Sequence, residues 1–141
     1  MPVRSADAVW EGDVPSGKGT MRFGGGAFEG QYSFSSRFEE GAGTNPEELI
    51  AAAHAGCYSM FVSGVLAKAG FTPTKVETTA KVKLDKVDDA WTVTNSTLVC
   101  QAQVPGIDEA AFQEAAETAK KNCPISRLLN TEISLDAKLV G

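Results

Sequence analysis

Three cysteines and an arginine are the residues whose types and positions could carry redox chemistry. Cys57 lies in the middle of a stretch that is apolar on all sides, and Cys123 ends an amphipathic segment and faces inward just before a proline. A buried thiol is inert unless its thiolate is stabilised, and Arg37, between two phenylalanines, is a candidate stabiliser. Cys100 has no charged neighbour in its alternating segment, so we expect it to be a small buried hydrophobe.

His54, the only histidine, stands three residues before Cys57. On a helix this spacing allows a Cys–His pair. A single histidine on an apolar helix is more often a hydrogen-bonded packing residue, which is the interpretation we favour. His54, Cys57 and Cys123 could also supply three metal ligands, although they lack the paired spacing of zinc motifs.

Length, composition and charge exclude several classes of function. A chain of 141 residues with 43% hydrophobic residues predicts a single domain, 1–141, with its own core. The net charge of −5 offers no basic surface for nucleic acid or for an anionic membrane. The uncharged stretch 49–67 contains polar residues and many alanines, so it predicts a buried helix rather than a membrane span. Residues 1–7 carry no apolar segment, and we expect a cytoplasmic protein.

The periodicity of apolar residues predicts an α+β chain. Short strands at 8–10, 20–23 and 32–34, separated by glycine-rich turns, predict an amino-terminal β-meander. The signals further along the chain predict a long central helix from about 45 to 68, a hairpin of strands 75–84 and 91–104, a helix over 108–121, a short helix over 124–129 and a last strand over 132–139.

Several motifs in order along the chain resemble the OsmC/Ohr family, and within it the OsmC branch. They are Arg37-Phe38-Glu39, Thr44-Asn45-Pro46-Glu47-Glu48-Leu49, Ala53-His54-Ala55-Gly56-Cys57, Leu84-Asp85-Lys86-Val87-Asp88, Val104-Pro105-Gly106-Ile107 and Cys123-Pro124-Ile125-Ser126. The resemblance spans nearly the whole chain. It implies the α+β OsmC-like fold and an intertwined homodimer.

The resemblance also implies an activity, a thiol-dependent peroxidase that reduces organic hydroperoxides to alcohols in oxidative and osmotic stress defence. The family's peroxidatic cysteine falls on Cys57, its resolving cysteine on Cys123, its activating arginine on Arg37 and its partner glutamate on Glu47. Such an enzyme needs no metal, haem or flavin, only an external dithiol or protein reductant. Cys100 is not part of the family's pattern. The alternative is a non-catalytic dimer that binds an apolar ligand or a metal.

The spacing of Glu47 and Cys57 raises a separate question. Ten residues on one straight helix separate their Cα atoms by ~15 Å, too far for a shared site. Glu47 is therefore either only a first-turn residue that favours the helix dipole, or it meets Arg37 and Cys57 across a dimer interface. We favour the second, because the resemblance implies an intertwined dimer.

Overall fold

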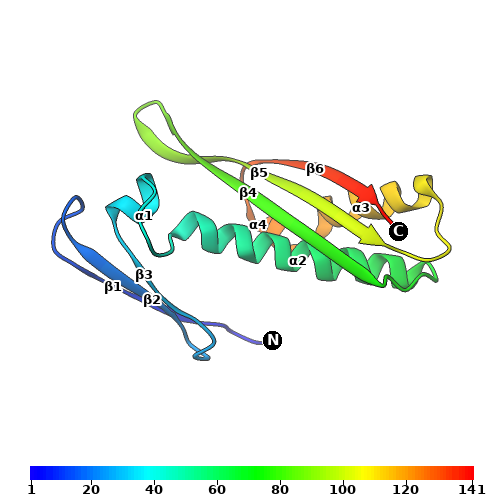
Figure 1. The fold of residues 1–141 in the computed structure, drawn as a ribbon, viewed down its shortest axis with the longest axis horizontal. Coiled ribbons are helices and arrows are strands. Elements are labelled where there is room, and N and C mark those ends of the chain that lie inside the picture. The colour runs from blue at the N-terminus through cyan, green and yellow to red at the C-terminus, as the bar shows by residue number, and fades with distance from the viewer. The chain divides into compact units, whose positions relative to one another are not determined.

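Three short strands form the sheet of the amino-terminal unit, Met1–Leu49, in the computed structural model, which describes residues 1–141 (Figure 1). Strands β1 (Ala6–Glu11), β2 (Lys18–Phe23) and β3 (Glu29–Tyr32) pair antiparallel in the order β1-β2-β3. The predicted meander is confirmed. Gly19 lies between two aromatic rings, where an added Cβ would stand 2.5 Å from Tyr32 and 2.7 Å from Trp10, so no larger residue fits there.

A short helix, α1 (Phe34–Phe38), follows β3 and was not predicted. The third strand was expected to reach Phe34, but it ends at Tyr32. The reason is local capping. The Ser33 side chain accepts from the backbone N–H of Ser36, and the Ser36 hydroxyl accepts from the backbone N–H of Ser33, so two backbone donors that have no partner within the helix are satisfied.

The second unit, Ile50–Gly141, contains a three-stranded sheet of order β4-β5-β6. Strands β4 (Lys75–Val87) and β5 (Ala90–Gln103) form the predicted antiparallel hairpin, and β6 (Glu132–Leu139) pairs parallel with β5. The hairpin strands run on to a two-residue turn at Asp88 and Asp89, whose φ angles of 49° and 64° are those of a turn that matches strand twist.

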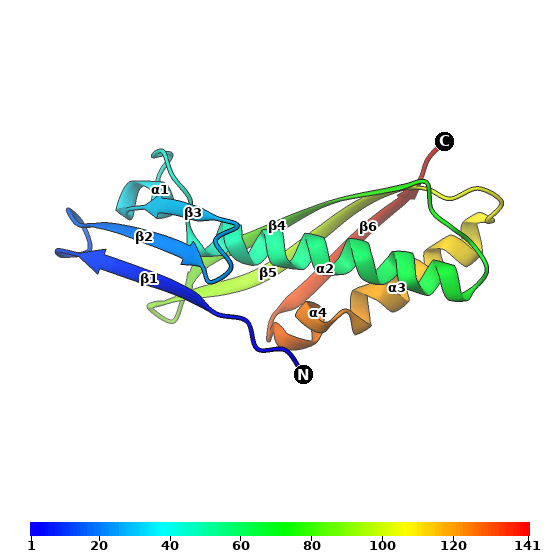
Figure 2. The same cartoon turned by 90° about the horizontal axis from the view of Figure 1, so that it is seen from below.

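The two predicted helices, α3 (Glu109–Asn122) and α4 (Pro124–Leu128), form the crossover from β5 to β6. They lie on the same face of the sheet as α2 (Pro46–Lys68), which Figure 2 shows from the helical side. The core lies between these helices and the sheet. Side chains that contribute to it are Tyr58, Val62 and Leu66 from α2, Leu98, Cys100 and Ala102 from β5, and Phe112, Ala115 and Ala119 from α3.

Helix α2 was expected to be buried all round, but within this chain it buries one face. The buried positions recur every fourth residue, at His54, Tyr58, Val62 and Leu66. The opposite face is exposed, and Met60 on that face is 82% exposed. By length and composition alone α2 could cross a membrane. Its polar buried side chains, His54 and Tyr58, are hydrogen-bonded inside the second unit.

Candidate active site

Cys57 and Cys123 meet inside the second unit. Cys57 lies in the middle of α2 and is partly buried, whereas Cys123 is the fully buried residue between α3 and α4. Cys57 packs against the core cluster that contains Cys123 and interacts with it, and both thiols are free. Two thiols that are in contact but not joined are placed to form a disulfide when one of them is oxidised.

The surroundings of Cys57 within this unit favour the neutral thiol. Burial raises the pKa of Cys57, and the neighbouring Cys123 raises it further, while the backbone N–H of Ile125 donates a hydrogen bond that lowers it. Burial is the largest of these effects. The reactive form of a cysteine is the thiolate, so Cys57 needs a cation from elsewhere to act as a nucleophile at neutral pH.

Arg37 and Glu47 form a two-pronged ion pair inside the first unit. Arg37 Nε donates to Glu47 Oε1 over 2.9 Å, and Arg37 Nη2 donates to Glu47 Oε2 over 3.0 Å. Only 12% of the Glu47 side chain is exposed, against 36% for Arg37. A paired fork of this kind fixes the orientation of the guanidinium as well as its charge.

This ion pair settles one question from the sequence. Glu47 is not only a first-turn residue, because it binds Arg37 with both carboxylate oxygens. The Arg37–Glu47 contact forms within one chain, while the expected approach of this pair to Cys57 across a dimer interface stays a prediction. The sequence analysis did not predict α1, the helix that carries Arg37 back toward the start of α2.

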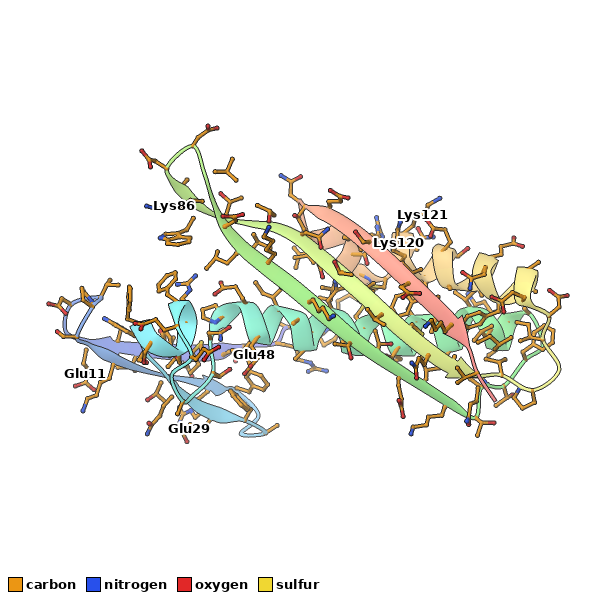
Figure 3. The ribbon with its side chains drawn as sticks, turned by 45° about the horizontal axis from the view of Figure 1, so that its top comes forward. Glu11, Glu29, Glu48, Lys86, Lys120 and Lys121 are labelled. Carbon is orange, nitrogen blue, oxygen red and sulfur yellow. The ribbon has the colours of Figure 1, made fainter.

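Two hydrogen bonds hold α1 against the residues before α2, and a third caps α2 itself. The Ser36 hydroxyl donates to the Thr44 carbonyl over 2.8 Å, and the Asn45 side-chain amide donates to the Ser36 carbonyl over 3.0 Å. The Asn45 side-chain oxygen accepts from the backbone N–H of Glu48, which lies at the start of α2 (Figure 3). Asn45 therefore caps α2 and anchors α1 with the same side chain.

An aromatic pocket opens beside Arg37 in the first unit. Its volume is about 200 Å³. It is lined by Trp10, Val14, Tyr32, Ser33, Phe34, Arg37 and Phe38. The pocket combines one permanent positive charge with apolar walls, so it suits a small ligand with a polar end and an apolar body.

His54 proves to be a hydrogen-bonded buried residue, as favoured from the sequence. Its Nδ1 lies 2.7 Å from Ser96 Oγ, and its Nε2 lies 2.8 Å from Ser126 Oγ. Sequence reasoning missed both serines. Ser96 left a signal, because it is a polar residue on the buried face of β5 and so requires a partner. Burial lowers the pKa of His54, which keeps its imidazole neutral.

Neither a Cys–His pair nor a three-ligand metal site finds geometric support. Both nitrogens of His54 bind serines rather than Cys57, and no group of three or more His, Cys, Asp or Glu side chains is arranged to hold a metal ion. Cys100 is fully buried between Leu98 and Ala102 on one face of β5, as predicted. Burial raises its pKa, so it is poorly suited to nucleophilic chemistry.

The structure thus assembles the four predicted site residues as two pairs. Cys57 contacts Cys123 in the second unit, and Arg37 binds Glu47 in the first. The first pair can form a redox disulfide, and the second presents a fixed, charged guanidinium beside an apolar pocket.

Known proteins resemble this chain over most of its length. Peroxiredoxin OsmC of Escherichia coli (strain K12) is 49% identical over 137 residues, covering 96% of each chain. An organic hydroperoxide resistance protein of Xanthomonas axonopodis pv. citri is 28% identical over 100 residues, covering 70% of this chain and 68% of its own.

Solved structures share the fold at lower identity. An OsmC-like protein of unknown function from Vibrio cholerae has a TM-score of 0.77 at 20% identity, with 97% of this chain and 99% of the other covered. The organic hydroperoxide resistance protein OhrB of Bacillus subtilis has a TM-score of 0.73 at 22% identity, with 96% and 98% covered. The family model for OsmC-like proteins matches residues 39–138, and this chain therefore belongs to the OsmC-like protein family.

Proposed function

We propose that this protein is a thiol peroxidase that reduces organic hydroperoxides to alcohols with two cysteines. The observation that carries the proposal is the contact between the free thiols of Cys57 and Cys123. The relatives support it, since one is named a peroxiredoxin and the other an organic hydroperoxide resistance protein. We take residues 1–141 to act as one domain, because the match to the Escherichia coli relative covers 96% of the chain and so includes most of both compact units.

In the first step the Cys57 thiolate attacks the distal oxygen of the hydroperoxide. The O–O bond breaks, the alcohol leaves after protonation, and Cys57 becomes a sulfenic acid. Arg37 supplies the positive charge that Cys57 lacks within its own unit, and Glu47 holds the guanidinium in place. The same guanidinium charge stabilises the negative charge that develops on the departing alkoxide.

In the second step Cys123 condenses with the sulfenic acid. A Cys57–Cys123 disulfide forms and water leaves, which protects Cys57 from further oxidation. A dithiol or protein reductant then restores both thiols by exchange. These steps use sulfur chemistry alone and call for no metal, haem or flavin.

The aromatic pocket beside Arg37 supports an organic substrate over hydrogen peroxide. Its rings, among them Trp10, Tyr32 and Phe38, would bury the alkyl or aryl group of the hydroperoxide. Hydrogen peroxide has no apolar surface to bury. We therefore expect the preference for organic hydroperoxides to reside mainly in KM.

The exposed face of α2 supports a homodimer. It consists of small or apolar residues without a charge, at Ala52, Ala53, Gly56, Met60, Gly64 and Ala67. Soluble proteins rarely leave such a continuous face in water, and a second copy of the chain would cover it. We propose that the active enzyme is an intertwined homodimer and that it works in the cytoplasm, where its three free cysteines stay reduced.

The proposal is tested by the consumption of cumene hydroperoxide by the reduced protein, with hydrogen peroxide for comparison. Cys57→Ser should abolish consumption, and Cys123→Ser should stop turnover after one equivalent. Cys100→Ser is the matched control and should consume peroxide at the wild-type rate. Tight binding of an apolar ligand without any consumption by the folded, reduced protein would instead identify a non-catalytic carrier.

A further inference from the structure

A buried histidine on the helix that carries Cys57 has no part in the two steps above. His54 is fully buried, and each of its ring nitrogens is hydrogen-bonded to a serine. Ser96 comes from β5 and Ser126 from α4, so the imidazole joins three elements of the second unit. A packing residue could satisfy its nitrogens in this way without further consequence. Ser126, however, has further hydrogen bonds beyond His54.

Ser126 connects His54 to the sulfur of Cys123. Ser126 Oγ lies 3.2 Å from Cys123 Sγ, and the Ser126 backbone N–H donates to the same sulfur over 3.3 Å. The result is an unbroken chain of side chains, Ser96–His54–Ser126–Cys123. All four are at most 7% exposed, so bulk water competes little for these bonds.

The donors and acceptors of this chain allow two arrangements. In one, the Cys123 thiol donates to Ser126 Oγ, the Ser126 hydroxyl donates to His54 Nε2, and Nδ1–H donates to Ser96. In the other, every donor is reversed, so that the Ser126 hydroxyl donates to Cys123 Sγ. The first arrangement carries the thiol proton toward the imidazole, and the second presents two donors to a sulfur that has lost it.

We propose that His54 and Ser126 are positioning residues for the resolving step, which relay the thiol proton away from Cys123 as its sulfur attacks oxidised Cys57. The inference rests on the two-cysteine function proposed above. The imidazole is placed to receive a proton because its Nε2 lies 2.8 Å from Ser126 Oγ. Burial lowers the pKa of His54, so the proton is passed on rather than kept. The Ser126 backbone N–H and hydroxyl then hold the sulfur in one orientation beside Cys57.

Atoms and electrons balance in this step. The S–O bond of the Cys57 sulfenic acid breaks, and an S–S bond to Cys123 forms. Cys57 sulfur is reduced and Cys123 sulfur is oxidised, while hydroxide leaves. The thiol proton passes to Ser126 Oγ as the Ser126 proton passes to His54 Nε2. The proton on His54 then neutralises the hydroxide, so the net products are one disulfide and one water.

The test separates the two steps in a single turnover. Reduced protein is mixed with one equivalent of cumene hydroperoxide, and hydroperoxide loss and disulfide formation are followed by rapid quenching and mass spectrometry. The measured quantity is the ratio of the rate constant for disulfide formation to that for hydroperoxide loss. His54→Gln can still hydrogen-bond to both serines but cannot take up a proton, and Ser126→Ala breaks the relay.

We expect the ratio to fall about a hundredfold or more in His54→Gln and in Ser126→Ala, in the range of a lost general base. Ser126→Thr, which keeps the hydroxyl, should restore it. The control is Ser59→Ala, because Ser59 also lies on α2 and donates to Thr78 over 2.7 Å but has no place in the relay. It should keep the wild-type ratio.

An unchanged ratio in folded His54→Gln and Ser126→Ala would overturn the relay and leave the peroxidase intact. If both variants fail to fold, the rate of disulfide formation in the wild-type protein is compared in H₂O and D₂O. A proton relay predicts a slower rate in D₂O, and an equal rate in the two solvents overturns the relay. A wild-type protein that consumes no hydroperoxide would overturn the peroxidase itself, and the relay with it.

Discussion

Among single residues, two cysteines of the candidate site supply the redox sulfur, and an arginine held by a glutamate supplies the positive charge. Cys57 has neighbours that raise its pKa, and the guanidinium that could reverse this effect is held by Glu47 through two hydrogen bonds. In the proposed mechanism Glu47 acts through the orientation of Arg37. A neutral amide in its place would keep the shape and lose the charge-assisted pairing.

Glu47→Gln is therefore expected to slow hydroperoxide reduction about tenfold, which corresponds to about 1.4 kcal/mol of weakened charge-assisted hydrogen bonding. The measurement is the rate of cumene hydroperoxide loss in a single turnover. Glu48→Gln is the matched control, since Glu48 accepts from the Thr44 hydroxyl rather than from Arg37. Equal rates for the two variants would show that the ion pair has no role in the reaction.

His54 gives a prediction about stability and pH. Burial lowers the pKa of His54 in the folded protein, while the unfolded chain keeps the ordinary value of about 6.5. The unfolded state therefore binds more protons below that pH. The stability gained by burying a neutral imidazole is complete above about pH 6.5 and is lost as the pH falls below it.

The free energy of unfolding should thus decrease between about pH 7 and about pH 5 in the wild type. The decrease should be shallower in His54→Gln, because His54 is the only histidine in the chain. Urea denaturation at several pH values measures it. Parallel curves for the two proteins would mean that His54 does not change its proton affinity on folding.

At the scale of elements, the position of Arg37 depends on how α1 is attached to the start of α2. Asn45 is the link, because its amide holds the Ser36 carbonyl and its oxygen caps α2. Asn45→Ser keeps a capping oxygen but loses the amide, whereas Asn45→Ala loses both. Each lost bond costs about 1 kcal/mol.

We expect both variants to lose peroxidase rate to a similar extent, since both release α1. Asn45→Ala should in addition be less stable than Asn45→Ser by about 1 kcal/mol. Thermal unfolding and single-turnover rates measure the two effects separately. A full wild-type rate in Asn45→Ser would contradict the role given to this link.

The elements that the sequence predicted are those with a long, regular pattern. Alternation along 75–84 and the apolar stretch before Lys68 each persist over many residues, so β4 and α2 were predicted correctly. Helix α1 has five residues and is held by serine caps and by contacts to Thr44 and Asn45. No periodicity could reveal it. The partners of His54 were missed for a different reason, because Ser96 and Ser126 are distant from it in sequence.

At the scale of the whole molecule, the uncharged face of α2 is the feature that a single chain leaves unexplained. Met60 is its most exposed large residue. If a second copy of the chain covers this face, Met60→Glu would bury an unpaired charge, which costs several kcal/mol. The variant should dissociate the dimer to monomers of 14.8 kDa.

Light scattering coupled to gel filtration measures this change. Val3→Glu is the control, because Val3 is equally apolar and 91% exposed but lies outside α2, and it should remain dimeric. A wild-type protein that is monomeric at all concentrations, or a Met60→Glu variant that stays dimeric, would contradict an interface on this face.

The central claim is that Cys57 and Cys123 form one redox pair and that Cys100 stands apart. One equivalent of cumene hydroperoxide, added to the fully reduced protein, tests this directly by thiol counting and peptide mapping. Free thiols should fall from three to one, with a Cys57–Cys123 disulfide and an unmodified Cys100. Three intact thiols, or a disulfide that includes Cys100, would contradict it.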